Sequence, residues 1–325
     1  MQYSSTELLT MVNEYIDSLN ISRPPVGLYA PIEYVLSMGG KRLRPVLALM
    51  AYNLYKDNIK DVLPTVTGIE IYHNYTLLHD DLMDRADCRR GKQTVHKKWN
   101  DNTAILSGDA MLILAYQCVA TCPQEKLPEV LDLFSRTALE ICEGQQYDVD
   151  FEIRNDVTEA EYMEMIRLKT SVLLACALKI GAILADAPQE EAEKLYEFGI
   201  NMGLAFQLED DLLDVYGDPK VFGKNIGGDI LCNKKTYMLI KALELADSEQ
   251  REQFDYWLNA TSFVPEKKIR AVTVLYDAIS IKELCLAQIR HYTAMALQSL
   301  QALNFPAEKT QGISSLVKRL MERES

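Results

Sequence analysis

Apolar residues recur at helical spacing along almost the whole chain. In the first segment Leu8, Val12 and Ile16 fall on one helical face, after Ser4 or Ser5 as a possible N-cap. No segment shows the two-residue alternation of a strand. The pattern predicts helices over residues 5–20, 30–37, 45–56, 62–85, 102–120, 127–150, 159–185, 189–217, 234–246, 248–258, 265–279, 281–302 and 310–322, separated by proline or glycine. We therefore expect an all-α fold, a large helical bundle around one central cavity.

Composition adds a prediction about domain organisation. The 325 residues include only 15 Gly and 11 Pro, with no low-complexity tract that could serve as a linker. Hydrophobic residues make up 48% and charged residues 25%, as in ordinary globular proteins. We expect residues 1–325 to form a single domain. The net charge of −13 argues against nucleic acid as a partner.

Cysteine and histidine usage indicates the compartment and excludes some chemistry. Seven cysteines are scattered without a C-x-x-C motif, which is typical of reduced thiols in the cytosol. The four histidines form no H-x-x-x-H motif, which argues against a zinc hydrolase. Neither a signal-peptide pattern nor a run of 18 apolar residues is present. We expect a cytoplasmic protein without stable membrane insertion.

Two distant segments share one acidic pattern, with Asp at positions i, i+1 and i+4. On a helix the first and last of these lie on one face, about 6 Å apart. Clustered carboxylates require a positive partner, and oxygen ligands without nearby His or Cys favour Mg²⁺. One copy alone is more often a solvated helix face, but two copies between apolar flanks favour a metal site shared by facing helices. The residues are Asp80, Asp81 and Asp84 in the first copy and Asp210, Asp211 and Asp214 in the second.

Basic residues flank the first acidic segment. Gly39–Pro45 reads GGKRLRP, in which glycines precede three cations and a helix-starting proline. Asp87–His96 contains the run RRGK. Each alone is more often a solvated basic loop. Around a carboxylate cluster in an acidic protein, both are expected to bind phosphate.

Further polar residues lie within apolar helical patterns. Gly144 marks close helix packing or ligand approach, with packing favoured. Lys169 and Thr170 interrupt an apolar helix, where a lysine either reaches solvent or faces an anion. Gln207 lies on the same helical face as the carboxylates of the second acidic segment. Downstream, a glycine-rich loop carries Lys224, but such loops are weakly specific alone.

Taken together, these motifs resemble the trans-isoprenyl diphosphate synthases, the short-chain polyprenyl synthase family of farnesyl and geranylgeranyl diphosphate synthases. The resemblance covers Gly39 to Thr236 and extends more diffusely to both ends. The family commonly has proline where this chain has Gln93, and often where it has Asn225, so loop geometry there differs. The matching motifs are GGKRLRP at 39–45, HDDLMD at 79–84, RRGK at 89–92, GQ-x-x-D at 144–148, KT at 169–170, FQ-x-x-DD-x-x-D at 206–214, GK at 223–224 and GD-I-x-x-x-K at 228–234.

The resemblance implies the isoprenoid synthase type of helical bundle and a Mg²⁺-dependent head-to-tail condensation of isopentenyl diphosphate with an allylic diphosphate. It assigns metal coordination to Asp80, Asp84 and Asp210, with Asp81, Asp211, Asp214 and Asp229 in support. It assigns the departing diphosphate to Arg89, Lys169, Lys224 and Lys234, the allyl cation to Thr170 and Gln207, and the second diphosphate to Lys41, Arg44, His73 and Arg90. Because no protein base is evident, the departing diphosphate would take the proton.

The resemblance also bears on product length. The growing chain is expected to run beside the first acidic helix toward its N-terminal end until a bulky side chain stops it. Thr76, one turn before Asp80, is small, whereas Tyr75 and Tyr72 are large. Both tyrosines could simply pack in the core. An aromatic residue five positions before the motif resembles geranylgeranyl-type synthases, so we expect geranylgeranyl diphosphate before farnesyl diphosphate as the product.

Three other functions are weighed against the synthase. A terpene cyclase has the first acidic motif but does not need GGKRLRP for a second diphosphate. A non-catalytic partner subunit would be free to lose carboxylates, and both motifs are intact here. An acidic helical scaffold explains neither the duplication nor the basic loops. By family resemblance we also expect a homodimer, with helix faces in 102–150 as the surface.

Overall fold

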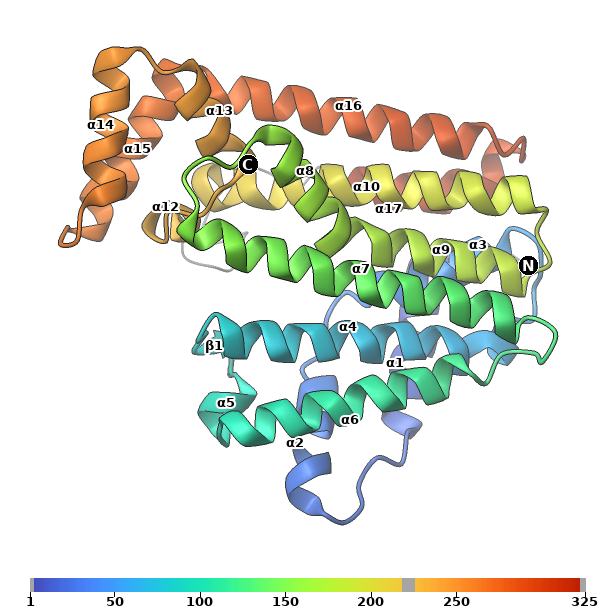
Figure 1. Cartoon of the computed structure of the whole chain (residues 1–325). Coiled ribbons are helices and arrows are strands. Elements are labelled where there is room, and N and C mark those ends of the chain that lie inside the picture. Colours follow the sequence, from blue (N-terminus) through green and yellow to red (C-terminus); the bar gives the residue numbers. More distant parts are fainter. Residues whose placement is uncertain (1–2, 218–225, 322–325) are drawn as a thin grey trace. The chain divides into compact units, whose positions relative to one another are not determined.

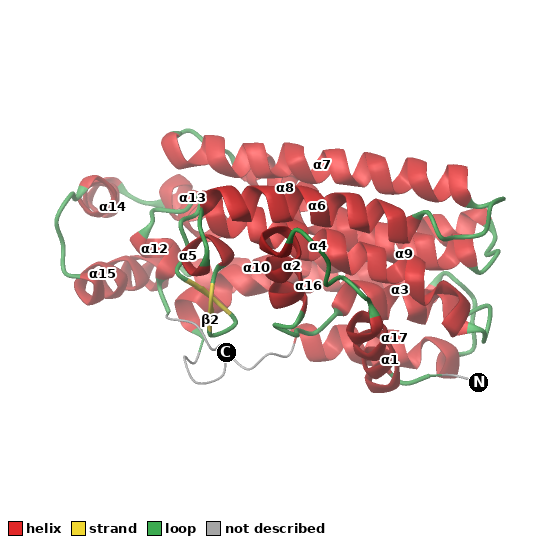
Figure 2. Cartoon of the chain, turned by 90° about the horizontal axis from the view of Figure 1, so that it is seen from below, coloured by secondary structure: helices red, strands yellow, loops and turns green. Residues whose placement is uncertain are grey.

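The structure, a computed structural model, describes residues 3–217 and 226–321 and is helical nearly throughout (Figures 1 and 2). The predicted all-α class is confirmed. By their contacts the residues fall into two compact units, described separately below. Unit 1 comprises Met1–Ser135, Cys176–Tyr196 and Phe305–Ile313, and unit 2 comprises Arg136–Ala175, Glu197–Asn304 and Ser314–Ser325. Whether the chain folds as a single domain stays a prediction.

Unit 1 holds the N-terminal helices and the first acidic motif. The elements that lie wholly in it are α1 (Ser5–Ser18), α2 (Val26–Leu36), α3 (Leu43–Asn53), the 3₁₀ turn η1 (Ile59–Val62), α4 (Leu63–Met83), strands β1 (Cys88–Arg89) and β2 (Lys92–Gln93), α5 (Val95–Lys98) and α6 (Asp101–Val119). Ser4 caps α1 through a capping box with Glu7. Helices α4 and α6 pack along each other, and a Cβ added at Gly108 of α6 would overlap the ring of His79 on α4.

Unit 2 holds the second acidic motif and most of the C-terminal helices. The elements with residues in it are α7 (Leu127–Ile153), α8 (Glu159–Ile166), the π-turn η2 (Arg167–Ser171), α9 (Val172–Leu184), α10 (Gln189–Tyr216), α12 (Gly228–Leu231), α13 (Tyr237–Leu245), α14 (Ser248–Asn259), α15 (Pro265–Ala278), α16 (Ile281–Gln301) and α17 (Ala307–Met321). α7, α9, α10 and α17 also contribute residues to unit 1. Phe254, Tyr276, Leu208 and Leu212 lie in its buried core.

The structure differs from the predicted elements at several places, and the short elements η1, α5 and α12 were not predicted. The helix predicted over residues 159–185 is interrupted by the π-turn Arg167–Ser171, an insertion that apolar spacing alone does not reveal. Helix α2 begins at Val26, earlier than predicted, and accommodates Pro31. Two short strands pair as a hairpin, Cys88 with Gln93 and Arg89 with Lys92.

None of the helices within 3–217 and 226–321 is both long and apolar enough to cross a membrane.

Candidate functional site

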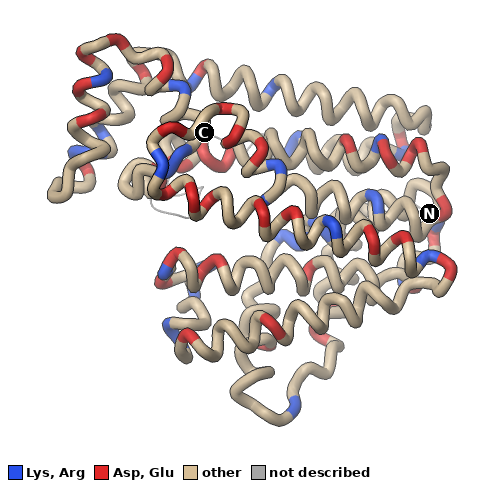
Figure 3. Tube along the Cα trace, in the orientation of Figure 1, with Lys and Arg blue, Asp and Glu red and all other residues tan. Residues whose placement is uncertain are grey.

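The first acidic motif lies at the C-terminal end of α4, where its three aspartates differ in environment. Asp81 is buried, and Arg89 Nε donates to its two carboxylate oxygens at 2.8 and 2.9 Å. Arg89 Nη2 lies 3.6 Å from Asp80 Oδ2, and the backbone N–H of Asp84 donates to the Asp80 carbonyl. Burial raises the pKa of Asp81 to about 6, against the opposing effect of Arg89. Arg89 therefore balances the charge of the motif on its buried side. Figure 3 shows acidic and basic positions close together at this end of α4.

The hairpin that carries Arg89 also presents Arg90. Its turn residues Arg90 and Gly91 have φ of 52° and 72°, as a two-residue hairpin turn with two left-handed positions requires. Arg90 Nη1 donates to the Gly39 carbonyl, and a Cβ on Gly40 would lie 2.7 Å from the Arg90 guanidinium. The structure thus brings the two basic motifs, GGKRLRP and RRGK, into contact.

Three of the four residues predicted to hold the second diphosphate influence one another electrostatically. Burial first, and then Arg44 and Arg90, hold the pKa of His73 well below its ordinary value, so the ring is neutral. Burial lowers the pKa of Arg44 to about 10, and its Nε is buried without a hydrogen-bond partner in the described chain. An unsatisfied guanidinium donor is costly and fits an anion. Lys41 is exposed.

Arg42, the remaining cation of GGKRLRP, has a different role that the sequence did not indicate. Its side chain is buried, and its Nη1 lies 3.0 Å from Glu70 Oε1 on α4. Nη2 donates to the Leu36 carbonyl at 2.6 Å, and Nε to Asn13 Oδ1 at 3.3 Å. These contacts join α1, α2 and α4 at the base of the motif. No sequence signal identifies Glu70 as the partner, since it lies in an otherwise apolar helical pattern.

The residues predicted to set chain length lie on α4 before the acidic motif. Tyr72 is 1% exposed, and its ring contacts Tyr75 and Phe134 with centroids 5.4 and 5.2 Å away. Tyr75 is partly buried and packs edge-on against His79. The Thr76 hydroxyl donates to the carbonyl three residues before it. Tyr72 is a core residue, whereas Tyr75 keeps exposed surface, and a role of either in product length stays a prediction.

In unit 2 the π-turn Arg167–Ser171 positions Lys169. Its Nζ lies 2.6 Å from Asp148 Oδ2, so the anion that this lysine faces in the structure is the aspartate of the GQ-x-x-D motif. A Cβ on Gly144 would lie 2.5 Å from the Lys169 backbone nitrogen. Gly144 therefore marks close helix packing, as the sequence indicated, and no role for Asp148 had been assigned.

Thr170 and Gln207 lie in a hydrogen-bonded series that ends at the second acidic motif. The Thr170 hydroxyl donates to Gln207 Oε1 at 3.0 Å, and Gln207 Nε2 donates to Asp211 Oδ1 at 3.0 Å. The buried Tyr162 hydroxyl donates to the other oxygen of Asp211. Burial raises the pKa of Asp211, against the effect of Lys234. Asp211 is only 3% exposed, and its carboxylate orients the amide of Gln207. Tyr162 is a site residue that the sequence analysis did not identify.

The rest of the second motif connects to the segment after the glycine-rich loop. The backbone N–H of Asp229 donates to Asp214 Oδ2 at 2.9 Å. Lys234 Nζ lies 3.7 Å from Asp229 Oδ1. Asp210 is partly buried. Lys224, with Gly223 and Asn225, lies outside the described residues.

The donor set fits a divalent cation that is completed by substrate. Among the described residues, no three His, Cys, Asp or Glu side chains are grouped so as to hold a metal ion by themselves. Mg²⁺ is usually held by one or two carboxylates together with phosphate oxygens and waters. Each motif supplies such carboxylates at a helix end. The two motifs lie in different units, and their approach to a common metal cluster stays a prediction.

Comparisons with known proteins agree with the family that the sequence resembles. Residues 25–275 match the family model described as polyprenyl synthetase. A short chain isoprenyl diphosphate synthase of Methanocaldococcus jannaschii is 42% identical over 253 residues, 78% of this chain and 77% of that protein. A geranylgeranyl diphosphate synthase of Methanosarcina mazei is 44% identical over 235 residues, 72% of each chain. A crystal structure of a geranylgeranyl pyrophosphate synthase superposes with a TM-score of 0.94 at 45% identity, covering 99% of this chain and 100% of that one.

Proposed function

The chain belongs to the polyprenyl synthetase family, and we propose on that basis that it condenses isopentenyl diphosphate head-to-tail with an allylic diphosphate. It is a short-chain trans-prenyltransferase. Two intact aspartate motifs, each near a helix end and each within the influence of a cationic side chain, are the observation that carries this proposal; the cations are Arg89 at the first motif and Lys234 at the second. A partner subunit without activity would not need both motifs.

In the proposed reaction the allylic carbon–oxygen bond breaks first. Asp80, Asp84 and Asp210 would hold Mg²⁺, which when bound withdraws charge from the departing diphosphate. Arg89, Lys169 and Lys234 would stabilise the same charge. Carboxylates at helix ends match the oxygen ligands that Mg²⁺ prefers.

The second substrate would be held by its diphosphate at Arg44, His73 and Arg90, with Lys41 nearby. The unsatisfied buried Nε of Arg44 supports an anion at this place. Binding of the diphosphate at these residues would hold the double bond of isopentenyl diphosphate within reach of the allyl cation. The carbon–carbon bond then forms, and the departing diphosphate would accept the proton that is released. Thr170 and Gln207 would direct their oxygen dipoles at the cation.

The test is product formation. Purified protein is incubated with Mg²⁺, isopentenyl diphosphate and, in parallel, dimethylallyl, geranyl or farnesyl diphosphate, and the products are separated by chain length. One short linear diphosphate is expected to accumulate. A cyclic hydrocarbon would indicate a terpene cyclase, and no elongation with any primer would leave the partner-subunit alternative.

For product length we propose that the bulky Tyr75, next to the small Thr76, stops the growing chain, with geranylgeranyl diphosphate before farnesyl diphosphate as the product. Tyr75→Ala is then expected to shift the products to longer chains, because it removes a ring five residues before Asp80, beside the expected path of the growing chain. Chromatography of the products measures the shift. Tyr75→Phe, which keeps the ring, is the matched control. If Tyr75→Ala leaves the distribution unchanged, Tyr75 is not the floor of the cavity.

We also propose a homodimer, supported by an apolar exposed face on α6. Ile105, Leu106 and Ile113 are 44%, 59% and 59% exposed, which is unusual for three large apolar residues on one helix. Ile113→Asp is expected to shift the protein toward monomers, because it places a charge in a surface that would be desolvated. Light scattering after size exclusion measures the mass, with the exposed Gln298→Asp on α16, outside the proposed surface, as control. A mutant with unchanged dimer mass would contradict this surface.

A cytoplasmic location stays a prediction.

A further inference from the structure

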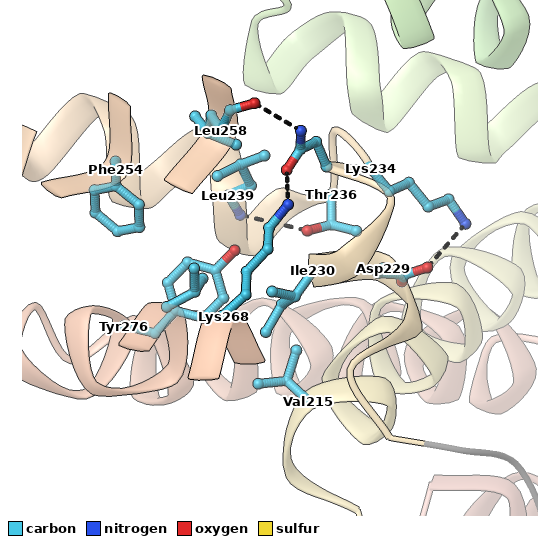
Figure 4. Close-up of a pocket in the computed structure, with 12 residues that line it drawn as sticks. Val215, Asp229, Ile230, Lys234, Thr236, Leu239, Phe254, Leu258, Lys268 and Tyr276 are labelled. Carbon is cyan, nitrogen blue, oxygen red and sulfur yellow. Dashed lines mark hydrogen bonds and ion pairs between the residues drawn. The ribbon is translucent and has the colours of Figure 1, made fainter. Parts of the chain in front are cut away.

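Lys268 on α15 is a buried lysine that the proposed chemistry does not use. It is 1% exposed, and its Nζ donates to Asn233 Oδ1 at 2.7 Å (Figure 4). The same Nζ donates to the Leu231 carbonyl at 3.3 Å. Nζ also lies 4.4 Å from the centre of the Phe263 ring. No Asp or Glu of the described chain forms an ion pair with it. A buried ammonium group is costly unless its donors are satisfied. The Lys268 ammonium is therefore held at the position where these neutral acceptors can bind it.

The acceptors of Lys268 lie on the segment that joins α12 to α13. Leu231 ends α12, so its carbonyl is one that the helix leaves without an internal partner. Asn233 has φ of 54°, the left-handed conformation that often follows a helix end. Its Nδ2 donates to the Leu258 carbonyl of α14 at 2.9 Å. The side chain of Asn233 is thus fixed from two sides, by α14 and by Lys268 on α15.

Lys234 follows Asn233 directly in the sequence and contacts Asp229, an acidic residue of the site. Its backbone N–H donates to the Asp229 carbonyl at 3.0 Å, and its Nζ lies 3.7 Å from Asp229 Oδ1. Asp229 is in turn bound through its backbone N–H to Asp214. The direction of the Lys234 side chain therefore depends on the backbone turn at Asn233. Figure 4 shows Lys268 reaching this segment from α15, and the side chain of Lys234 extending from the segment toward Asp229.

We propose that Lys268 is a positioning residue, which holds Asn233 in its left-handed turn and thereby directs Lys234 and Asp229 toward the diphosphate of the allylic substrate. The inference rests on the proposed function of the same site. Lys268 acts through Asn233 and does not touch substrate. Its loss is expected to weaken binding of the allylic diphosphate and its Mg²⁺, and to leave the isopentenyl diphosphate site in unit 1 unchanged.

A purely structural role predicts a different result. The pocket around Lys268 is lined by apolar side chains that include Leu239, Phe254 and Val272. If Lys268 only stabilised this packing, its replacement would lower the melting temperature and the fraction of folded enzyme. The KM values of the folded fraction would then be unchanged for both substrates.

The test compares Lys268→Met, which keeps the length of the side chain, with Lys267→Met at the exposed neighbouring position. Initial rates give KM for each diphosphate and the Mg²⁺ concentration for half-maximal activity. For Lys268→Met we expect KM for the allylic diphosphate to rise about 10-fold or more, the usual scale for residues that orient a site, with KM for isopentenyl diphosphate unchanged. Lys267→Met should match the wild type. Lys268→Gln, which keeps a donor, should recover part of the loss.

Asn233→Gly tests the same contact if Lys268→Met does not fold. Glycine keeps the left-handed backbone accessible but removes the amide that Lys268 binds. The same selective rise in KM is expected. Unchanged KM values in the folded variants, or an equal rise for both substrates, would overturn the inference. A wild-type enzyme that elongates no primer would instead overturn the proposed function.

Discussion

Asp80→Asn is expected to lower kcat about 10³-fold, since loss of an electrostatic contact to charge that develops in the transition state typically costs about 10²–10³-fold and a metal site adds to that effect. Asp80 lies at the C-terminal end of α4 with its side chain 19% exposed, where it can reach a metal. Asparagine has nearly the same size but lacks the negative charge that binds Mg²⁺. Steady-state rates at saturating substrates and Mg²⁺ measure the change.

The controls separate metal binding from folding. Asp17→Asn, at an exposed position of α1, should leave both kcat and the melting temperature unchanged. Asp80→Asn should also melt as the wild type does, because the bidentate contact of Arg89 is made to Asp81. Activity of Asp80→Asn within tenfold of the wild type would show that Asp80 is not a required metal ligand.

Much of the fold was predictable because most helices carry their own signals. Apolar spacing with caps and prolines located α4, α6, α7 and α10 to within a few residues. The π-turn that carries Lys169 and Thr170 was not predictable, because it inserts one residue into a continuous apolar pattern. Its position depends on close packing against Gly144, which is a tertiary contact.

The sequence predicted which residues belong to the candidate site, but not which of their side chains contact one another. The sequence placed Asp80 and Asp81 together, but only burial and the geometry of Arg89 distinguish their environments. The contact of Tyr162 with Asp211 joins residues 49 positions apart, and no local pattern indicates it. Partners of this kind are set by long-range packing, which one sequence does not display.

The three cations of GGKRLRP illustrate the same point through stability, because they are alike in the sequence and differ in burial. Arg42→Met is expected to lower the free energy of unfolding by about 3–5 kcal/mol, the usual effect of removing one partner of a buried ion pair. Both side chains of the Arg42–Glu70 pair are only 2% exposed. The variant leaves the Glu70 carboxylate buried with Asn74 Nδ2 as a hydrogen-bond donor at 3.1 Å. Urea unfolding followed by circular dichroism measures the loss.

The double variant Arg42→Met with Glu70→Met isolates the cause. Replacing both members of a buried pair by apolar residues of similar volume is often neutral, so the double variant should be more stable than Arg42→Met alone. Lys41→Met, at the exposed neighbouring position, should leave unfolding unchanged. A double variant no more stable than Arg42→Met would mean that the contacts of Arg42 to Leu36 and Asn13, and not the unpaired carboxylate, account for the loss. If the predicted recovery is observed, Arg42 serves the basic motif mainly by neutralising the buried Glu70 carboxylate at its base, and the proposed binding of the diphosphate does not involve it.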